Sequence, residues 1–282
     1  MTTLSNADLH SVEAHRVTGG GGVELRVDDT GNRAGRAIVF IHGFSQCRLA
    51  WRGQMASDLR DDFRLLAVDL RGHGDSGRPR DAFGDSRLWA DDLDAVITAL
   101  DLQQPVLCGW SYGGAVIGDY LSVYGQQKIG GIALVGAVSR LGEPLMPFLG
   151  EDFVAVIPGL FADDQEECTA AVEKFIGITT SAPQAMEDYY LSLGYNLAVS
   201  SSTRKAMLSR TLNHDNLFGR LSSPALLIHG VEDKVVQTRM SAHLAGLIPR
   251  ATLSWYEGVG HSPFLENPER FNADLCHFVA SL

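Results

Sequence analysis

Short apolar runs alternate with longer amphipathic stretches over most of the chain. The runs predicted to be strands lie at residues 12–17, 23–27, 37–41, 64–68, 105–108, 129–138, 225–230 and 251–256. The first two flank four glycines, Gly19 to Gly22, which suit a hairpin turn. The later runs are continuously apolar, a pattern typical of strands that are buried on both faces. We therefore expect an α/β fold with a mostly parallel eight-stranded sheet and helices on both faces.

Helical patterns lie between these strands. One helix is predicted at 49–59, and another begins at Asp85 or Ser86, with its apolar residues on one face. Further helices are predicted at 115–124 and 238–247. The last helix opens at Asn267, which is followed by a proline at the first helical position.

The alternation of strands and helices stops between residues 139 and 216. Four helices are predicted there, at 153–161, 166–175, 183–198 and 203–212, with no strand between them. The segment is too long for a structureless loop. We therefore expect a helical cap at 139–216, inserted into a core domain that is formed by 1–138 and 217–282.

Composition narrows the class of partner. The 282 residues are 45% hydrophobic and 20% charged, which is ordinary for a globular protein. The net charge is -11, and the acidic residues are scattered, which argues against a nucleic-acid partner and mildly against anionic substrates. We expect a small-molecule substrate. The sequence leaves the oligomeric state open.

The cysteines and the apolar runs indicate where in the cell the protein is expected. The four cysteines show no C-x-x-C or metal-ligand spacing; they are Cys47, Cys108, Cys168 and Cys276. Reduced thiols in a cytoplasmic protein are the expectation. Residues 1–10 lack the features of a secretory leader, and no run approaches the roughly 18 apolar residues of a membrane span.

One apolar run ends in a serine between small residues. The segment reads Cys108-Gly109-Trp110-Ser111-Tyr112-Gly113-Gly114 and predicts a strand, a sharp turn and a helix. Such a turn presents the serine hydroxyl and leaves the N–H of Tyr112 free at the helix N-terminus. The motif alone is weak, because about 0.2 copies are expected by chance in a chain of this composition. A glycine-rich turn with a solvent-facing serine is the alternative.

Other reactive side chains follow the ends of neighbouring strands. In doubly wound sheets, the loops beyond the carboxyl ends of the strands carry the reacting groups. Besides Ser111, these loops carry His42-Gly43-Phe44, the stretch from Asp69 to Gly77, Glu232-Asp233 and Gly260-His261. A serine, a carboxylate and an imidazole thus occur in the chain order Ser, Asp, His.

Together these motifs resemble the α/β-hydrolase superfamily. They are Gly109-Trp110-Ser111-Tyr112-Gly113-Gly114, His42-Gly43-Phe44, Asp69-Leu70-Arg71-Gly72-His73-Gly74-Asp75-Ser76, Gly230-Val231-Glu232-Asp233 and Gly260-His261-Ser262-Pro263. The esterase, cofactor-free haloperoxidase and C–C bond hydrolase branches are most similar. The resemblance covers nearly the whole chain except 139–216, which corresponds to the variable cap of that family. It is specific for fold and machinery and not for substrate.

The resemblance and the chemistry assign a role to each residue. Ser111 is the expected nucleophile and His261 the base that activates it. Asp233 is expected to hold the second ring nitrogen of His261, and the family spacing favours it over Glu232. The backbone N–H groups of Phe44 and Tyr112 are the expected oxyanion hole.

Other groups receive less specific interpretations. Structural roles are expected for His42 and His229, and His73 and Arg71 are expected to organise their loop. No metal is predicted, because no pair of histidines has ligand spacing, and no cofactor is expected. A mostly apolar substrate pocket is suggested for Trp110, Phe148, Phe153, Phe161, Tyr189 and Tyr190. The cap side chains among them could instead pack the insertion onto the sheet.

The expected reaction is hydrolysis of a small neutral or hydrophobic carboxylic ester or lactone through an acyl-enzyme. A cofactor-free haloperoxidase or perhydrolase is the nearest alternative, although those proteins often continue His-Gly with Trp-Pro, where this chain has Phe44-Ser45. A C–C bond hydrolase and an acyltransferase also stay open. A ligand receptor that retains the three residues is the hypothesis from another class.

Overall fold

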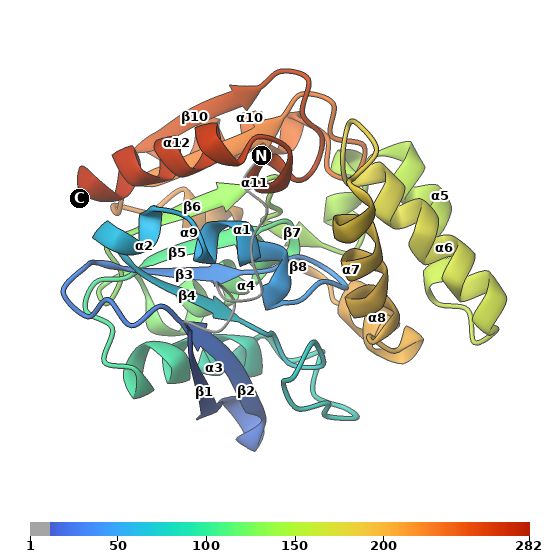
Figure 1. The fold of residues 1–282 in the computed structure, drawn as a ribbon, viewed down its shortest axis with the longest axis horizontal. Helices are drawn as coiled ribbons and strands as arrows, with labels where there is room; N and C mark the ends of the chain where they lie inside the picture. Colours follow the sequence, from blue (N-terminus) through green and yellow to red (C-terminus); the bar gives the residue numbers. More distant parts are fainter. Residues whose placement is uncertain (1–11) are drawn as a thin grey trace.

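An eight-stranded sheet forms the centre of the structure, a computed structural model that describes residues 12–282. The strand order is β1-β2-β4-β3-β5-β6-β9-β10 (Figure 1). The strands are β1 (Glu13–Thr18), β2 (Glu24–Asp29), β3 (Ala37–Ile41), β4 (Arg64–Val68), β5 (Val106–Trp110), β6 (Gly131–Val135), β9 (Ala225–Gly230) and β10 (Ala251–Tyr256). The β1–β2 and β2–β4 pairs are antiparallel, and the other pairs are parallel. The predicted mostly parallel sheet is confirmed.

Side chains of each central strand alternate between two cores. On β3, Val39 and Ile41 enter the larger core, whereas Ile38 and Phe40 enter the smaller one on the opposite face. The larger core includes side chains of α3 (Ser86–Ala99), α4 (Tyr112–Tyr124), α9 (Asp215–Phe218) and α10 (Arg239–Leu247). The smaller core includes side chains of α1 (Arg52–Met55), α2 (Leu59–Asp62), α11 (Pro263–Glu266) and α12 (Pro268–Ala280). Because both faces of the central strands are buried, the side chains along these strands are mostly apolar.

Helix α3 starts at its predicted capping residue, whereas another predicted helix is wrong. Asp85 accepts a hydrogen bond from the N–H of Arg87 at the start of α3, as predicted. The expected helix at 49–59 is instead a 3₁₀ turn (Arg48–Trp51) followed by the separate helices α1 and α2. The Ser57 hydroxyl donates to the Gln54 carbonyl at 2.7 Å between these helices. This local bond competes with the helical hydrogen bonds and explains the break.

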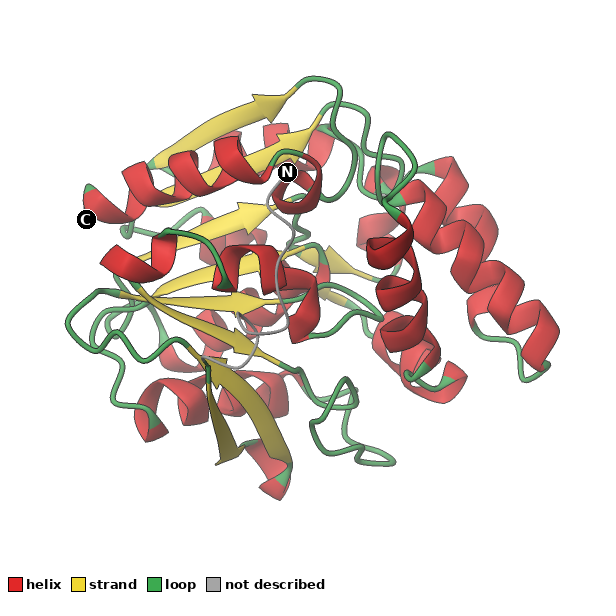
Figure 2. Cartoon of the chain, viewed as in Figure 1, coloured by secondary structure: helices red, strands yellow, loops and turns green. Residues whose placement is uncertain are grey.

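Four helices lie beyond the carboxyl ends of the parallel strands (Figure 2). They are α5 (Glu151–Leu160), α6 (Gln165–Ile178), α7 (Met186–Leu197) and α8 (Ser201–Leu208). A two-residue antiparallel pair that the sequence did not predict, β7 (Arg140–Leu141) with β8 (Leu212–Asn213), joins the two ends of this segment. We call residues 139–216 the cap, and the domain division at its ends stays a prediction.

Two predictions concern membranes and leaders. Among the described residues, no helix is long and apolar enough to cross a membrane. The stretch 1–10, for which no secretory leader was expected, lies outside the described residues.

Candidate active site

Ser111 lies at a sharp turn between β5 and α4. Its backbone has φ 54° and ψ -115°, a conformation that costs a non-glycine residue about 1–3 kcal/mol. The adjacent glycines are required by close backbone approach: a Cβ on Gly113 would lie 2.6 Å from the Ile41 carbonyl oxygen. A Cβ on Gly109 would lie 2.8 Å from the carbonyl carbon of Gly113. The predicted strand, turn and helix are therefore present, and the serine occupies their strained apex.

Two backbone N–H groups beside Ser111 are free. Within residues 12–282, the N–H groups of Phe44 and Tyr112 have no hydrogen-bond acceptor. The loop that carries Phe44 lies directly against the serine, because a Cβ on Gly43 would be 3.0 Å from the Ser111 Cβ. Free donors at this turn are able to bind a developing negative charge.

His42 fixes the loop that carries Phe44. Its Nδ1 donates to the Gly43 carbonyl at 2.8 Å, and its Nε2 accepts from the Leu70 N–H at 3.0 Å. Burial lowers the pKa of His42 to about 4, so the ring is neutral at pH 7. Its position in the loop is structural, as the sequence predicted.

Asp233 and His261 form a buried pair. His261 Nδ1 lies 2.6 Å from the Asp233 Oδ2. The other carboxylate oxygen accepts from the N–H groups of Val235 and Val236, at 2.8 and 2.9 Å. Burial on its own raises the pKa of Asp233, but the His261 charge and the histidine hydrogen bonds outweigh it, so the pKa is well below its usual range. Asp233 is therefore a carboxylate that orients the imidazole.

A second histidine contacts the same carboxylate. His229 Nε2 lies 3.1 Å from Asp233 Oδ2 and 2.9 Å from the Val236 carbonyl oxygen. Its Nδ1 lies 2.6 Å from the Ser241 hydroxyl, which fixes the ring from its other side. A structural role was expected for His229, and its contact with Asp233 was not predicted. The sequence contained one indication of this contact: His229 and Asp233 are four residues apart across the end of β9.

Gly136 connects the serine and the acid–histidine pair in space. The Ser111 N–H donates to Val135, the residue before Gly136, at 2.9 Å. A Cβ on Gly136 would lie 3.1 Å from His261 Nδ1 and 3.2 Å from Asp233 Oδ2. From the serine side, Trp110 Nε1 donates to the His261 carbonyl at 2.8 Å. The three loops with the predicted reactive residues therefore meet at one end of the sheet.

Glu232 and Cys47, two nearby groups, have other surroundings. Glu232 is exposed, and its carboxylate accepts from the Gly258 N–H at 3.1 Å. Burial raises the pKa of Cys47 to about 12, so its side chain is a protonated thiol at pH 7. Neither group is placed to act in place of Asp233 or Ser111.

The predicted substrate-pocket residues are dispersed. Trp110 lines a pocket between the core and the cap, and Phe148, Phe153, Phe161, Tyr189 and Tyr190 are not among its lining residues. Phe153 packs edge-on against Phe44, with ring centroids 6.2 Å apart. Phe148 packs on His243, and Tyr190 is 63% exposed. The assignment of these six side chains to a substrate pocket stays a prediction.

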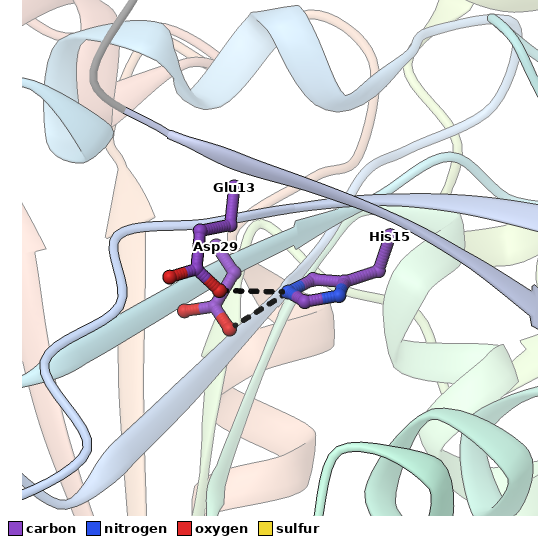
Figure 3. A group of neighbouring side chains, drawn as sticks. All are labelled: Glu13, His15 and Asp29. Atoms are coloured by element: carbon purple, nitrogen blue, oxygen red, sulfur yellow. Dashed lines mark hydrogen bonds and ion pairs between the residues drawn. The ribbon is translucent and has the colours of Figure 1, made fainter.

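A group of metal-ligating residue types lies elsewhere, on the edge hairpin. His15 Nε2 is 3.2 Å from Asp29 and 3.6 Å from Glu13 (Figure 3). Asp29, however, already binds the Arg64 guanidinium, with one contact at 2.7 Å. A cation there would face the positive charge of Arg64, so we assign no metal site to this group.

A serine at a strained strand-to-helix turn, an acid–histidine pair and a mostly parallel sheet define an α/β hydrolase. A sequence profile of the alpha/beta hydrolase fold matches residues 36–268, and the chain therefore belongs to this family.

Solved esterases share the fold. An esterase from Rhodococcus sp. ECU1013, RhEst1, is 35% identical with a TM-score of 0.92, over 95% of this chain and 99% of that one. A putative aryl esterase from Burkholderia cenocepacia is 33% identical with a TM-score of 0.87, over 95% and 98%. A non-heme chloroperoxidase from Streptomyces lividans is 31% identical over 94% of this chain and 99% of that protein.

Proposed function

We propose that the protein is a serine esterase that hydrolyses small, neutral or hydrophobic carboxylic esters or lactones. The buried Asp233–His261 pair beside the strained turn of Ser111 carries this proposal. The esterases among its relatives support the substrate class. Its net charge of -11 favours neutral over anionic esters.

In the proposed reaction, His261 removes the proton of the Ser111 hydroxyl as the oxygen attacks the ester carbonyl. The negative oxygen of the tetrahedral intermediate is stabilised by the N–H groups of Phe44 and Tyr112, each worth roughly 3–4 kcal/mol in comparable sites. The imidazolium then protonates the leaving alcohol, which leaves an acyl-enzyme. Water, deprotonated by His261, releases the acid and restores the serine. Asp233 stabilises the imidazolium in both steps.

A fluorophosphonate probe tests the nucleophile. We expect it to modify Ser111, as located by peptide mass spectrometry, and to leave Ser111→Ala unmodified. Ser122→Ala, which removes an exposed serine from the same helix, is the matched control and should label like wild type. Folded wild-type protein that takes no label on Ser111 would contradict the proposal. The receptor hypothesis would then be tested by ligand-dependent thermal stabilisation.

Perhydrolysis is the second candidate, and the chloroperoxidase relative favours it. In this reaction, hydrogen peroxide replaces water as the attacker of the acyl-enzyme, and the products are a peracid and free Ser111. Turnover of an ester with added peroxide, with the peracid measured by its oxidation of bromide, separates the two reactions. A peracid yield no greater than that of the Ser111→Ala variant would exclude perhydrolysis.

The cytoplasmic location predicted from the sequence is likewise a proposal. All four cysteines are free in the structure, which is the state expected in a reducing compartment.

A further inference from the structure

The carboxylate of Glu266 lies beside His261 and has no role in the proposed reaction. Glu266 is the last residue of α11, and its Oε1 accepts from the backbone N–H groups of Gly260 at 2.9 Å and Ser262 at 3.4 Å. These are the two residues that flank His261 in the chain. One carboxylate oxygen therefore holds the backbone on both sides of the proposed base.

The other oxygen of Glu266 binds the cap. Its Oε2 accepts from the backbone N–H of Ser181 at 2.7 Å, and the Ser181 hydroxyl also lies 2.7 Å away. Ser181 belongs to the turn 179–185, which connects α6 and α7 in the cap. Hydrogen bonds to a carboxylate are roughly twice as strong as those between neutral groups. The side chain of Glu266 thus bridges the cap and the loop of the proposed base.

Close backbone contact accompanies this bridge. A Cβ on Gly260 would lie 2.8 Å from the Ser181 nitrogen and 2.9 Å from the Thr180 carbonyl carbon, so a side chain there would push the cap turn away. The Ser181 hydroxyl also lies 2.7 Å from the Gly258 carbonyl oxygen. Two separate features of the loop, a glycine and a carboxylate, therefore fit the same turn of the cap.

His261 is also held by residues outside the cap. Its carbonyl accepts from Trp110 Nε1 at 2.8 Å, and its ring Nδ1 lies 2.6 Å from the Asp233 carboxylate. Trp110 ends β5, and Asp233 follows β9. The position of His261 therefore depends on three anchors, and the one through Glu266 is shared with the cap.

We propose that Glu266 is a positioning residue that couples docking of the cap to the placement of His261. The inference rests on the proposed esterase function, because that function makes His261 the base. With the cap turn docked, the donors of Ser181 orient the carboxylate, and the carboxylate fixes the N–H groups beside His261. Displacement of the turn removes these donors and leaves the loop of His261 less firmly held. The proposed machinery is therefore complete only under a docked cap.

Hydrogen exchange followed by mass spectrometry tests the coupling without turnover. Glu266→Leu removes both acceptor oxygens, and we expect the amides of the cap turn 179–185 and of the loop 258–262 to exchange about tenfold faster. Glu269→Leu removes an exposed carboxylate three positions further along the chain and should exchange like wild type in both segments. Faster exchange in the loop alone, with the cap turn unchanged, would overturn the coupling.

The rate of fluorophosphonate labelling tests the effect on the base, because labelling of Ser111 requires an activating histidine but no suitable ester. We expect the second-order rate constant to fall by about tenfold to a hundredfold in Glu266→Leu. Glu266→Gln retains one acceptor oxygen and should label at an intermediate rate. A side chain that only stabilised the fold would lower the Tm and leave the labelling rate, measured well below that Tm, within about twofold of wild type. That result would overturn the positioning role.

A variant of the cap turn tests whether Glu266 acts together with Ser181. Ser181→Ala removes the hydroxyl and should slow labelling by about threefold. The double variant Ser181→Ala/Glu266→Leu should label no more slowly than Glu266→Leu alone, because the two side chains belong to one hydrogen-bond network. Effects that multiply in the double variant would overturn the coupling.

The exchange measurement separates this inference from the proposed function. If the wild type neither labels nor hydrolyses esters, yet Glu266→Leu loosens both segments, the esterase proposal fails and the connection between the cap and the loop of His261 stands. If the wild type labels on Ser111 and the cap turn exchanges equally in Glu266→Leu and wild type, the coupling alone fails.

Discussion

At the residue scale, the Asp233 carboxylate is the group that fixes the geometry of the proposed machinery. One of its oxygens contacts both His229 and His261, and the other accepts two backbone N–H groups. Asp233→Asn would put an amide N–H against one of these partners and favour the wrong tautomer of His261. We expect kcat to fall by about a thousandfold to ten-thousandfold, measured by ester hydrolysis at pH 7.

Glu232 provides the matched control for this prediction. It is the neighbouring acid in the sequence, and its carboxylate binds the Gly258 N–H rather than His261. Glu232→Gln should therefore hydrolyse esters within about threefold of the wild-type rate. If Glu232→Gln were the inactive variant and Asp233→Asn the active one, the assignment of the acid would be wrong.

The buried histidines make the free energy of unfolding depend on pH. Burial lowers the pKa of His73 to about 3 and that of His42 to about 4. The unfolded chain binds these protons near pH 6.5, before the folded protein does. Between about pH 6.5 and 4 the unfolded state thus holds more protons, and stability falls as pH falls, by at most roughly 1.4 kcal/mol per pH unit for each histidine.

Urea unfolding at several pH values tests this dependence. His73→Asn retains a donor for the Arg71 carbonyl, to which His73 Nδ1 is bonded at 2.9 Å, but it cannot titrate. We expect a smaller loss of stability between pH 6.5 and 4 than in wild type. His277→Asn removes an exposed histidine and should keep the wild-type slope. If the free energy of unfolding depended on pH equally in the His73 and His277 variants, the prediction would be wrong.

The sequence predicted some residues of the candidate site and missed others. The difference has a physical cause. Ser111 has a local signature, because its strained turn requires glycines at fixed positions. Asp233 and His261 follow from the order of the strand ends. Gln46 and Asn196, in contrast, line the same pocket only because the cap docks on the core, and no local pattern in either segment contains that arrangement.

At the element scale, one arginine joins the cap helices to the loop of the proposed oxyanion hole. Arg204 of α8 is fully buried and donates to the Ser45 hydroxyl at 3.0 Å, next to Phe44. The same guanidinium donates to the carbonyls of Leu160, at the end of α5, and Asn196, in α7. Among the described residues it has no carboxylate partner, so its charge is used entirely in hydrogen bonds to neutral acceptors.

Arg204→Met should therefore disturb both the cap and the loop. The three oxygen acceptors would lose their donor in a buried site, which costs about 2–4 kcal/mol in total. We expect a lower Tm, and a kcat reduced by about tenfold when it is measured well below that Tm. Lys205→Met removes the neighbouring exposed charge and is the control. A kcat equal to that of wild type would mean that Arg204 stabilises the cap without positioning the loop.

Element prediction succeeded where the signals were local. The cap and the final helix follow from periodicity and from cap residues such as Asn267. The break after α1 depends on one hydroxyl, that of Ser57, which an apolar pattern does not register. The β7–β8 pair joins residues about 70 positions apart, and two-residue strands carry no alternation that could be recognised.

At the scale of the whole molecule, the cap is tied to the core by a buried ionic group. Arg210 donates to Asp119 of α4 at 2.6 Å and to the Tyr112 hydroxyl at 2.9 Å, and His214 lies 3.0 Å from the same carboxylate. The returning end of the cap is thereby fixed to the helix that starts at Ser111. The apolar pattern of the sequence gave no indication of this connection, which depends on side chains that are distant in sequence.

The overall charge makes a final prediction about substrates. A net charge of -11 repels anions over the Debye length, which is about 30 Å at 0.01 M salt and about 8 Å at 0.15 M. Raising the salt concentration should therefore increase kcat/KM for monomethyl succinate, which carries one carboxylate, by about twofold to tenfold. The neutral dimethyl succinate is the control and should change by less than about 1.5-fold, because no long-range force acts on it. Faster hydrolysis of the monoester at low salt would mean that a local positive field outweighs the charge of the molecule.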